Sequence, residues 1–283
     1  MVPLKVEFIY TGYCKNFKKS ALRTAKWEII QYPALCIYIE HPVHGKILFD
    51  TGYSTHVLDE TQRLPYSLIR MLTPITLQLE DTAAHQLMMK GIHPDEIQYI
   101  IISHFHVDHI GGLKDFPKAK FIHLPCAYRK CKDLKGFAAV HAAFNPGLMP
   151  RDFESRAQGI NEEIKIETPY AQFPQGMDIF GDGSIIAIDL PGHAFGQIGI
   201  LLTAENGQRM FFIADASWTS EAVRNHVPPN FIGKFILHDY QAFLKTLRSL
   251  HLFQQSYPDV KIIPTHCPEI YAEWKNSKLK SVR

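Results

Sequence analysis

The sequence predicts an α+β protein of 283 residues, built from two successive strand-rich halves that are each followed by a helix. Apolar runs at residues 99–102 and 260–263 have the composition of buried strands, and each leads into a turn that contains histidine. Residues 79–90 and 240–255 instead space their apolar side chains as an amphipathic helix does. We therefore expect one domain over residues 1–283, with halves at about 1–175 and 176–283.

Net charge, apolar runs and cysteine content limit the classes of protein to which this chain can belong. The formal charge of +2 gives no strong electrostatic preference for a partner. No apolar run is long enough to span a membrane, and the N-terminus lacks the apolar segment of a signal peptide. The five cysteines are odd in number and scattered, so they form no secreted disulfide framework. We expect a cytoplasmic protein, without a membrane partner.

The first half begins with strands at 4–10, 33–40 and 46–49, the last two joined by the turn 41–45. His41 and His44 lie in this turn and could be metal ligands, but histidines in an exposed turn are ordinarily only solvated. A helix follows at 79–90, and strands are expected at 99–102 and 120–124. Residues 53–78 and 136–175 lack regular periodicity, so they are either apolar walls of a site or packed loops.

The second half restarts at Met177 with a strand at 184–189. Strands at 198–202 and 210–213 flank Glu205-Asn206-Gly207-Gln208, which predicts a hairpin. The helix at 240–255 ends before Pro258, and a final strand follows at 260–263.

The strand at 99–102 leads into a cluster of metal-ligand residue types: His104, His106, Asp108 and His109, followed by a glycine pair. Alternate side chains of an extended segment point to one side, so His104 and His106 can bind one ion. Asp108 and His109 then suit a second ion. Imidazole and carboxylate without thiolate favour zinc, with manganese, iron and cobalt as alternatives.

The H-x-H-x-D-H motif with its following Gly-Gly resembles that of the metallo-β-lactamase-fold hydrolases. The resemblance spans about residues 4–267 and implies a four-layer αββα sandwich with a dinuclear metal site at the edge of two mixed sheets. It implies three more ligands, which this chain offers as His193, a bridging Asp215 and His266. One metal would then be held by His104, His106 and His193, and the other by Asp108, His109 and His266.

The same resemblance implies a hydrolase in which a hydroxide between two zinc ions attacks the substrate. Asp108 is the candidate proton carrier for the leaving group. Asp50, at the end of the strand 46–49, would accept the outer N–H of a ligand histidine and orient its ring.

Among such enzymes the chain is most similar to the acyl-homoserine lactonase branch, which opens bacterial signalling lactones and so quenches quorum sensing. We expect the chain to act, as a monomer or homodimer, on a small-molecule ester or lactone with an apolar part. That branch places a tyrosine three residues after the bridging aspartate, where this chain has Trp218. Either the substrate differs, or another group such as Tyr53 supplies the hydroxyl.

Three alternatives stay open at this stage. A thioesterase of the glyoxalase type would keep every ligand, and so would a phosphodiesterase or ribonuclease. The basic residues between Lys114 and Lys135 favour a phosphate substrate, although acidic residues interrupt them and we expect no nucleic-acid partner. A non-catalytic metal-binding protein of the same fold is the third alternative.

Overall fold

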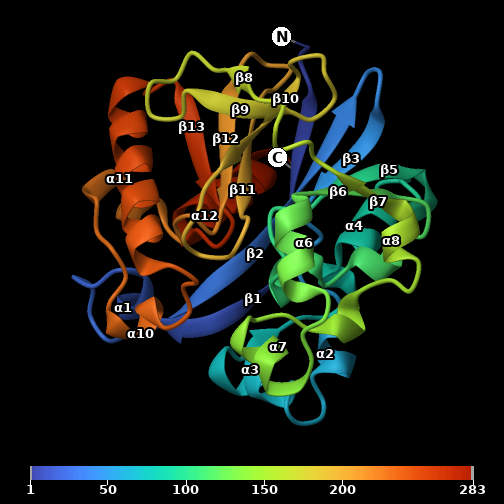
Figure 1. The fold of residues 1–283 in the computed structure, drawn as a ribbon, viewed down its shortest axis with the longest axis vertical. Coiled ribbons are helices and arrows are strands. Elements are labelled where there is room, and N and C mark those ends of the chain that lie inside the picture. The colour runs from blue at the N-terminus through green and yellow to red at the C-terminus, as the bar shows by residue number, and fades with distance from the viewer. Residues whose placement is uncertain (1, 282–283) are drawn as a thin grey trace.

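The computed structural model describes residues 2–281 and folds them around two mixed β-sheets (Figure 1). The strand order is β4-β1-β2-β3-β5-β6-β7 in the first sheet and β13-β12-β11-β10-β9-β8 in the second. The first sheet contains β1 (Lys5–Phe17), β2 (Ile29–His41), β3 (Gly45–Phe49), β4 (Ile75–Thr76), β5 (Ile97–Ile101), β6 (Lys120–His123) and β7 (Ala157–Gly159). The second contains β8 (Ile166–Glu167), β9 (Gln175–Asp178), β10 (Ile185–Asp189), β11 (Ile198–Thr203), β12 (Arg209–Ala214) and β13 (Val260–Pro264).

Helices cover the outer faces of both sheets, as the predicted sandwich requires (Figure 1). The α-helices are α1 (Lys18–Ala21), α2 (Thr55–Glu60), α3 (Ser67–Leu72), α4 (Ala83–Met88), α5 (Val107–Ile110), α6 (Pro125–Cys131), α7 (Gly136–His141), α8 (Phe153–Arg156), α9 (Ser220–Asn225), α10 (Phe231–Lys234), α11 (Tyr240–Ser256) and α12 (Pro268–Ser281). Short 3-10 helices lie at Leu79–Asp81, Pro94–Glu96, Leu113–Asp115 and Pro146–Leu148.

The core lies between the sheets and beneath the helices. Phe212 of β12 reaches across to Phe8 of β1 and Phe49 of β3, with ring centroids 5.9 and 6.5 Å apart. On the outer face of the second sheet, the buried side of α11 packs Phe243 and Phe253 against the strands. The predicted layer order, helix–sheet–sheet–helix, is therefore confirmed.

The paired strands β1 and β2 are longer than the sequence suggested, because β1 continues past its predicted end at residue 10 and β2 begins before its predicted start at residue 33. The register shifts between Tyr10 and Tyr13, around Gly12, whose φ of +77° favours glycine. Pairing resumes beyond this bulge as far as Phe17 and Ile29. The bulge interrupts the period-two pattern, so the sequence pattern alone indicated a shorter strand.

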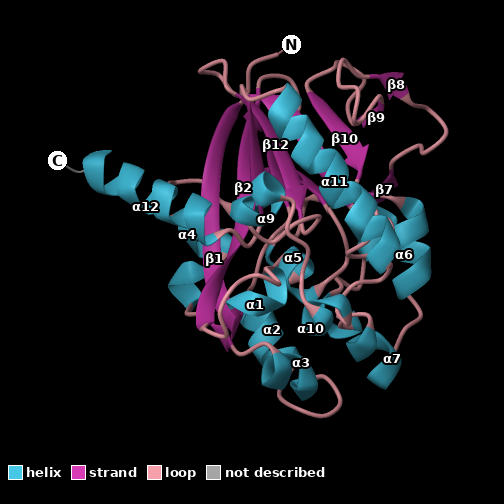
Figure 2. Cartoon of the chain, turned by 90° about the vertical axis from the view of Figure 1, so that its left-hand side faces the viewer, coloured by secondary structure: helices cyan, strands magenta, loops and turns pink. Residues whose placement is uncertain are grey.

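The irregular stretches contain helices that are too short to show a helical period in the sequence. Residues 53–78 form α2, α3 and β4, and residues 136–175 contain α7 and α8 with two very short strands. Figure 2 shows α1, α2, α3, α7 and α10 gathered at the end of the sheets where α5 lies. They surround the region that contains the histidine-rich motif.

All five cysteines are free thiols. Over residues 2–281, none of the helices combines the length and the apolar character that crossing a bilayer requires.

Candidate metal centre

The carboxyl ends of five strands meet at one edge of the sandwich. In the first sheet β3 and β5 run parallel, and in the second β12 runs parallel to β13. Strand β10 points the same way as β12, because both are antiparallel to β11. The segments that leave these ends carry Asp50, His104, His193, Asp215 and His266, so the topology gathers residues from distant parts of the sequence.

All seven predicted metal-ligand residues come together at this edge, in overlapping groups whose ligand atoms lie within 4.8 Å of one another. Nδ1 of His106 is 2.9 Å from Nε2 of His193. Nε2 of His266 is 3.1 Å from an oxygen of Asp108. Three groups are formed: His104, His106 and His193; His104, His109 and Asp215; and Asp108, His109 and His266.

Asp215 lies between the two outer groups. One carboxylate oxygen is 3.2 Å from Nε2 of His109, and the other is 3.4 Å from Nε2 of His193 and 3.3 Å from Nε2 of His266. A carboxylate has acceptor lone pairs on both oxygens, so Asp215 is placed to share two cations. The distances from Asp215 to the surrounding histidines therefore fit the bridging position that the resemblance implied for it.

Unusual backbone conformations deliver some of these side chains. Asp50 and Ala214 have positive φ angles of 59° and 47°, which non-glycine residues rarely adopt. Gly192 has φ +133°, and a Cβ there would collide with the backbone of Phe243 in α11. Such conformations cluster at functional sites, where the chain must turn sharply to aim a side chain.

A hydrogen-bond network fixes the tautomers of two candidate ligand rings. Asp50 accepts from the backbone N–H of Ser103 at 2.8 Å and from its hydroxyl at 2.7 Å. Nδ1 of His109 lies 2.7 Å from the same carboxylate, which can only accept, so this nitrogen carries the proton. The Ser103 hydroxyl has given its only proton to Asp50, so it accepts from Nδ1 of His104 at 3.0 Å. In the neutral rings, Nε2 of His104 and His109 therefore keeps a lone pair.

His266 is oriented in the same way by the backbone. Its Nδ1 lies 2.8 Å from the carbonyl oxygen of Pro33 in β2, and a carbonyl can only accept. The Nε2 lone pair of the neutral ring then faces Asp108 and Asp215. Binding of the outer nitrogen to a fixed acceptor is the usual way in which a ligand histidine is held.

The residues present fit divalent cations. Nε2 of His104, Nε2 of His109 and one oxygen of Asp215 are buried polar atoms with no hydrogen-bond partner within the described residues. Unpaired buried polar atoms are costly, and here they face one another in a small space. Five imidazoles and two carboxylates form a donor set suited to zinc and to other first-row metals.

Burial and neighbouring charge divide the histidines into two kinds. Burial lowers the pKa of His106 to about 3 and that of His193 to about 4. Burial also opposes charging of His109, but Asp50 and two further carboxylates raise the pKa of this ring to about 10. His106 and His193 are therefore neutral at pH 7, whereas His109 must release a proton to bind a metal ion.

A cavity of about 120 Å³ opens onto the cluster, and both predicted substrate contacts line it. Trp218 does not point its N–H at open space: the indole donates to Asp215 at 3.0 Å. Tyr53 is 2% exposed, and burial, with a hydrogen bond to Cys14 among the smaller causes, raises the pKa of its hydroxyl well above 10. The remaining wall is largely apolar and includes Ile69, Val107 and Ile236.

A second histidine cluster lies away from this edge, and it corrects the interpretation of His41 as solvated. His41 is 2% exposed, and its Nε2 is 3.3 Å from Asp182, as is Nε2 of His44. Nδ1 of His41 accepts the backbone N–H groups of Val43 and His44, so the proton of the neutral ring sits on Nε2. A protonated Nε2 cannot bind a metal ion, so this cluster joins two turns instead.

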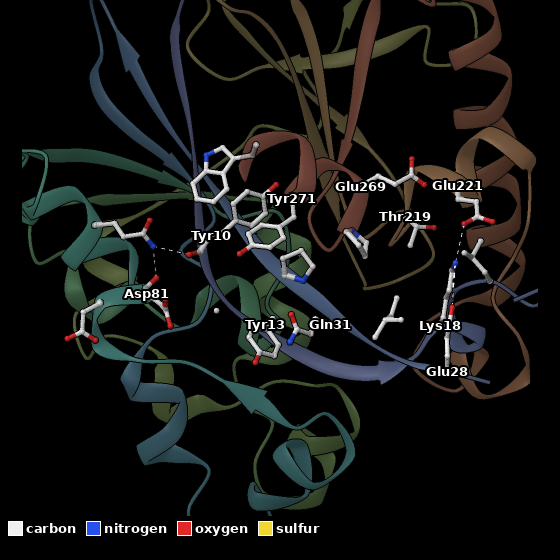
Figure 3. Close-up of a pocket in the computed structure, with 18 residues that line it drawn as sticks. Tyr10, Tyr13, Lys18, Glu28, Gln31, Asp81, Thr219, Glu221, Glu269 and Tyr271 are labelled. Atoms are coloured by element: carbon white, nitrogen blue, oxygen red, sulfur yellow. Dashed lines mark hydrogen bonds and ion pairs between the residues drawn. The ribbon is translucent and has the colours of Figure 1, made fainter. Parts of the chain in front are cut away.

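A larger cavity, of about 790 Å³, lies along β1 and β2 where α12 passes (Figure 3). Tyr10, Tyr13 and Tyr271 line its middle, and Glu28, Glu221 and Glu269 lie toward one end. None of the seven candidate ligands lines it. Its size therefore does not identify the chemical site.

Two contributors to the centre escaped the sequence analysis. Ser103 connects Asp50 to His104, and its place beside the motif was the available signal. The carbonyl of Pro33 holds His266 from 233 residues away, and a backbone carbonyl leaves no mark in a sequence.

Comparison with known protein families gives a match over most of the chain. The model of the metallo-beta-lactamase superfamily matches residues 30–266. The N-acyl homoserine lactonase AttM of Rhizobium radiobacter is 22% identical over 281 residues, covering 98% of each chain. An N-acyl homoserine lactonase of a Bacillus species is 26% identical over 231 residues, covering 81% of this chain and 82% of its own.

Solved structures give the same fold. An N-acyl homoserine lactone hydrolase with the product N-hexanoyl-L-homoserine at its catalytic metal centre superposes with a TM-score of 0.75 at 20% identity. The match covers 96% of this chain and 97% of that one. A probable metal-dependent hydrolase from Staphylococcus aureus gives a TM-score of 0.68 at 13% identity, covering 94% and 91%.

Proposed function

Because the chain belongs to the metallo-β-lactamase superfamily, we propose that it is a divalent-metal hydrolase that opens lactones or cleaves related carboxylic esters. The observation that carries this proposal is the convergence of five histidines and two aspartates at one edge of the sandwich. The lactone is the first choice of substrate because full-length relatives are named N-acyl homoserine lactonases.

The ligand residues divide into two sets. His104, His106 and His193 would hold one ion, and Asp108, His109 and His266 the other, with Asp215 shared between them. When bound, two divalent ions of this kind, zinc in the first instance, supply a hydroxide near neutral pH by lowering the pKa of the water between them.

Asp108 is the proposed proton carrier for the leaving alcohol. It is the second residue of α5, and it lines the cavity together with Asp215 and His266. Nearby histidines hold its pKa below the usual range against the opposing effect of burial, so it enters the reaction as the carboxylate. It can accept the proton of the attacking water and return it to the departing oxygen.

Trp218 and Tyr53 take different parts in this proposal. The indole N–H is already engaged with Asp215, so Trp218 positions the shared carboxylate and does not bind the substrate oxygen. Tyr53 keeps its proton because its pKa is raised, and its ring lines the same cavity. The Tyr53 hydroxyl is therefore the protein donor that we propose for the substrate carbonyl.

The apolar part of the substrate would lie against the wall formed by Ala21, Ile69, Val107 and Ile236. Burial of apolar surface contributes about 25 cal/mol per Å², so such a wall favours an aliphatic group of the substrate over a nucleotide.

Metal analysis followed by a turnover screen tests this function. The purified protein is stripped with a chelator, reloaded with zinc, manganese, iron or cobalt, and offered acyl lactones, thioesters and phosphodiesters. We expect two ions per chain and ring opening that depends on them, with no phosphodiester cleavage. Cleavage of thioesters or RNA in preference to lactones would reassign the substrate, and a protein that binds no metal would refute the proposal.

A further inference from the structure

A second chamber, of about 370 Å³, adjoins the metal centre from another side. His106 and His193 form part of its wall and also line the smaller cavity described above. Ile236 borders both spaces as well. Ligand sites commonly enclose about 300–1,000 Å³, a range that the second chamber reaches and the smaller cavity alone does not.

The inner part of this chamber is apolar. Phe105, Phe144 and Ala194 line it and are 5%, 1% and 7% exposed. Leu134 and Ala138 extend the same surface outward from the two ligand histidines. A substrate group that extends from the metal centre into the chamber therefore contacts apolar side chains first.

The outer part carries basic side chains without any acid. Lys130 of α6, His141 at the end of α7 and His238 before α11 line it, and all three are exposed. No aspartate or glutamate is among the lining residues. Lys130 has no carboxylate within ion-pair distance in residues 2–281, whereas nearby Lys132 lies 3.7 Å from Glu154. The uncompensated charge creates a local preference for anions.

Packing holds these outer groups in place. The ammonium of Lys130 lies 5.5 Å from the ring centroid of Phe195, and this ring meets His238 edge to face at 5.4 Å. The turn at Phe195 is fixed because Gly196, with φ +65°, lies against α6, where a Cβ would come within 2.7 Å of Ala127. The backbone N–H of His238 donates to the carbonyl of His193 at 2.9 Å, so this wall is tied to a metal ligand.

We propose that the second chamber binds an anionic group of the substrate, a carboxylate or a phosphate, joined to the scissile ester by a short apolar segment. The apolar inner wall takes the segment, and Lys130, His141 and His238 take the charge. This inference rests on the proposed esterase or lactonase chemistry and names a substrate class for it.

The test compares three 4-nitrophenyl esters that share a six-carbon acyl chain and end in a methyl, a carboxylate or a phosphate. We expect the metal-loaded enzyme to give a higher kcat/KM with one or both charged esters than with the methyl ester. Lys130→Met should lower the charged-to-methyl ratio about fivefold, the upper range for an exposed ion pair. Lys132→Met, from an exposed lysine already paired with Glu154, is the matched control and should leave the ratio unchanged.

A binding measurement separates this inference from the hydrolytic function. Metal-free protein is titrated by NMR with monomethyl adipate and with methyl hexanoate, neither of which requires turnover. We expect Lys130→Met to weaken the binding of monomethyl adipate and to leave the binding of methyl hexanoate unchanged. If no ester is hydrolysed but this difference in binding is found, the proposed hydrolytic function is wrong and the anion-binding role of the second chamber is supported. Esters hydrolysed with equal kcat/KM, or a ratio that Lys130→Met and Lys132→Met change alike, would overturn the anion site.

Discussion

Replacing Asp50 by asparagine tests whether the protein enforces the tautomer of its ligand histidines. The carboxylate is 1% exposed and accepts three hydrogen bonds, two from Ser103 and one from Nδ1 of His109, all between 2.7 and 2.8 Å. The amide of the variant would present an NH₂ group to at least one of these donors. When this NH₂ group faces His109, the ring can pair with it only by moving its proton to Nε2, the nitrogen that faces the other ligands.

The expected loss follows from what such outer hydrogen bonds contribute. Removing the partner of a ligand histidine commonly weakens metal binding about 10- to 100-fold, which is about 1.4 to 2.8 kcal/mol. Because one Asp50 carboxylate serves His109 directly and His104 through Ser103, we expect the upper half of this range. Competition with a chromophoric chelator measures the zinc affinity of Asp50→Asn and of the unmodified protein.

Asp115 supplies the matched control. It also accepts from a serine, Ser54 at 2.9 Å, and contacts a histidine, His56 at 2.8 Å, but neither partner is a candidate ligand. Asp115→Asn should leave zinc affinity within about twofold of the unmodified protein, since its partners do not orient a ligand. Zinc affinity unchanged in Asp50→Asn, or lowered equally in Asp115→Asn, would refute the tautomer argument.

Three further predictions concern single residues. Asp108→Asn should lower kcat at least about 100-fold in protein reloaded to full metal content, and intact turnover at unchanged content would remove its role as proton carrier. Trp218→Phe removes the N–H that donates to Asp215, a charge-assisted bond worth about 1.5 kcal/mol, so we expect metal affinity to fall about tenfold; a chelator titration that shows no change would contradict this. Burial, helped by His44 and opposed by Asp182, lowers the pKa of His41 below its unfolded value of about 6.5, so stability should be lost as pH falls through that value. His41→Asn keeps a hydrogen-bond acceptor but does not titrate, so the Tm of this variant should fall less between about pH 7 and pH 5 than that of the unmodified protein. An equal fall would show that His41 does not cause the loss of stability at low pH.

The sequence by itself determined the class of fold and named the candidate ligands. Period-two and helical patterns located most of the long strands and α11, because burial of one face imposes a pattern that can be read along the chain. The motif from His104 to His109 specified metal chemistry, since these residue types seldom crowd together for another reason. His193, Asp215 and His266 could be named because each follows an apolar strand and matches the order that the resemblance implied.

Only the tertiary structure decided how those residues are used. No local pattern encodes the hydrogen bond between His266 and the Pro33 carbonyl, or the one from the Trp218 indole to Asp215. The burial of His41 likewise depends on segments that meet only in the folded protein. The second chamber is likewise formed by helices and turns that meet only after folding. Local spacing fixes which side chains share a face, but the positions of loops relative to one another depend on packing across the whole molecule.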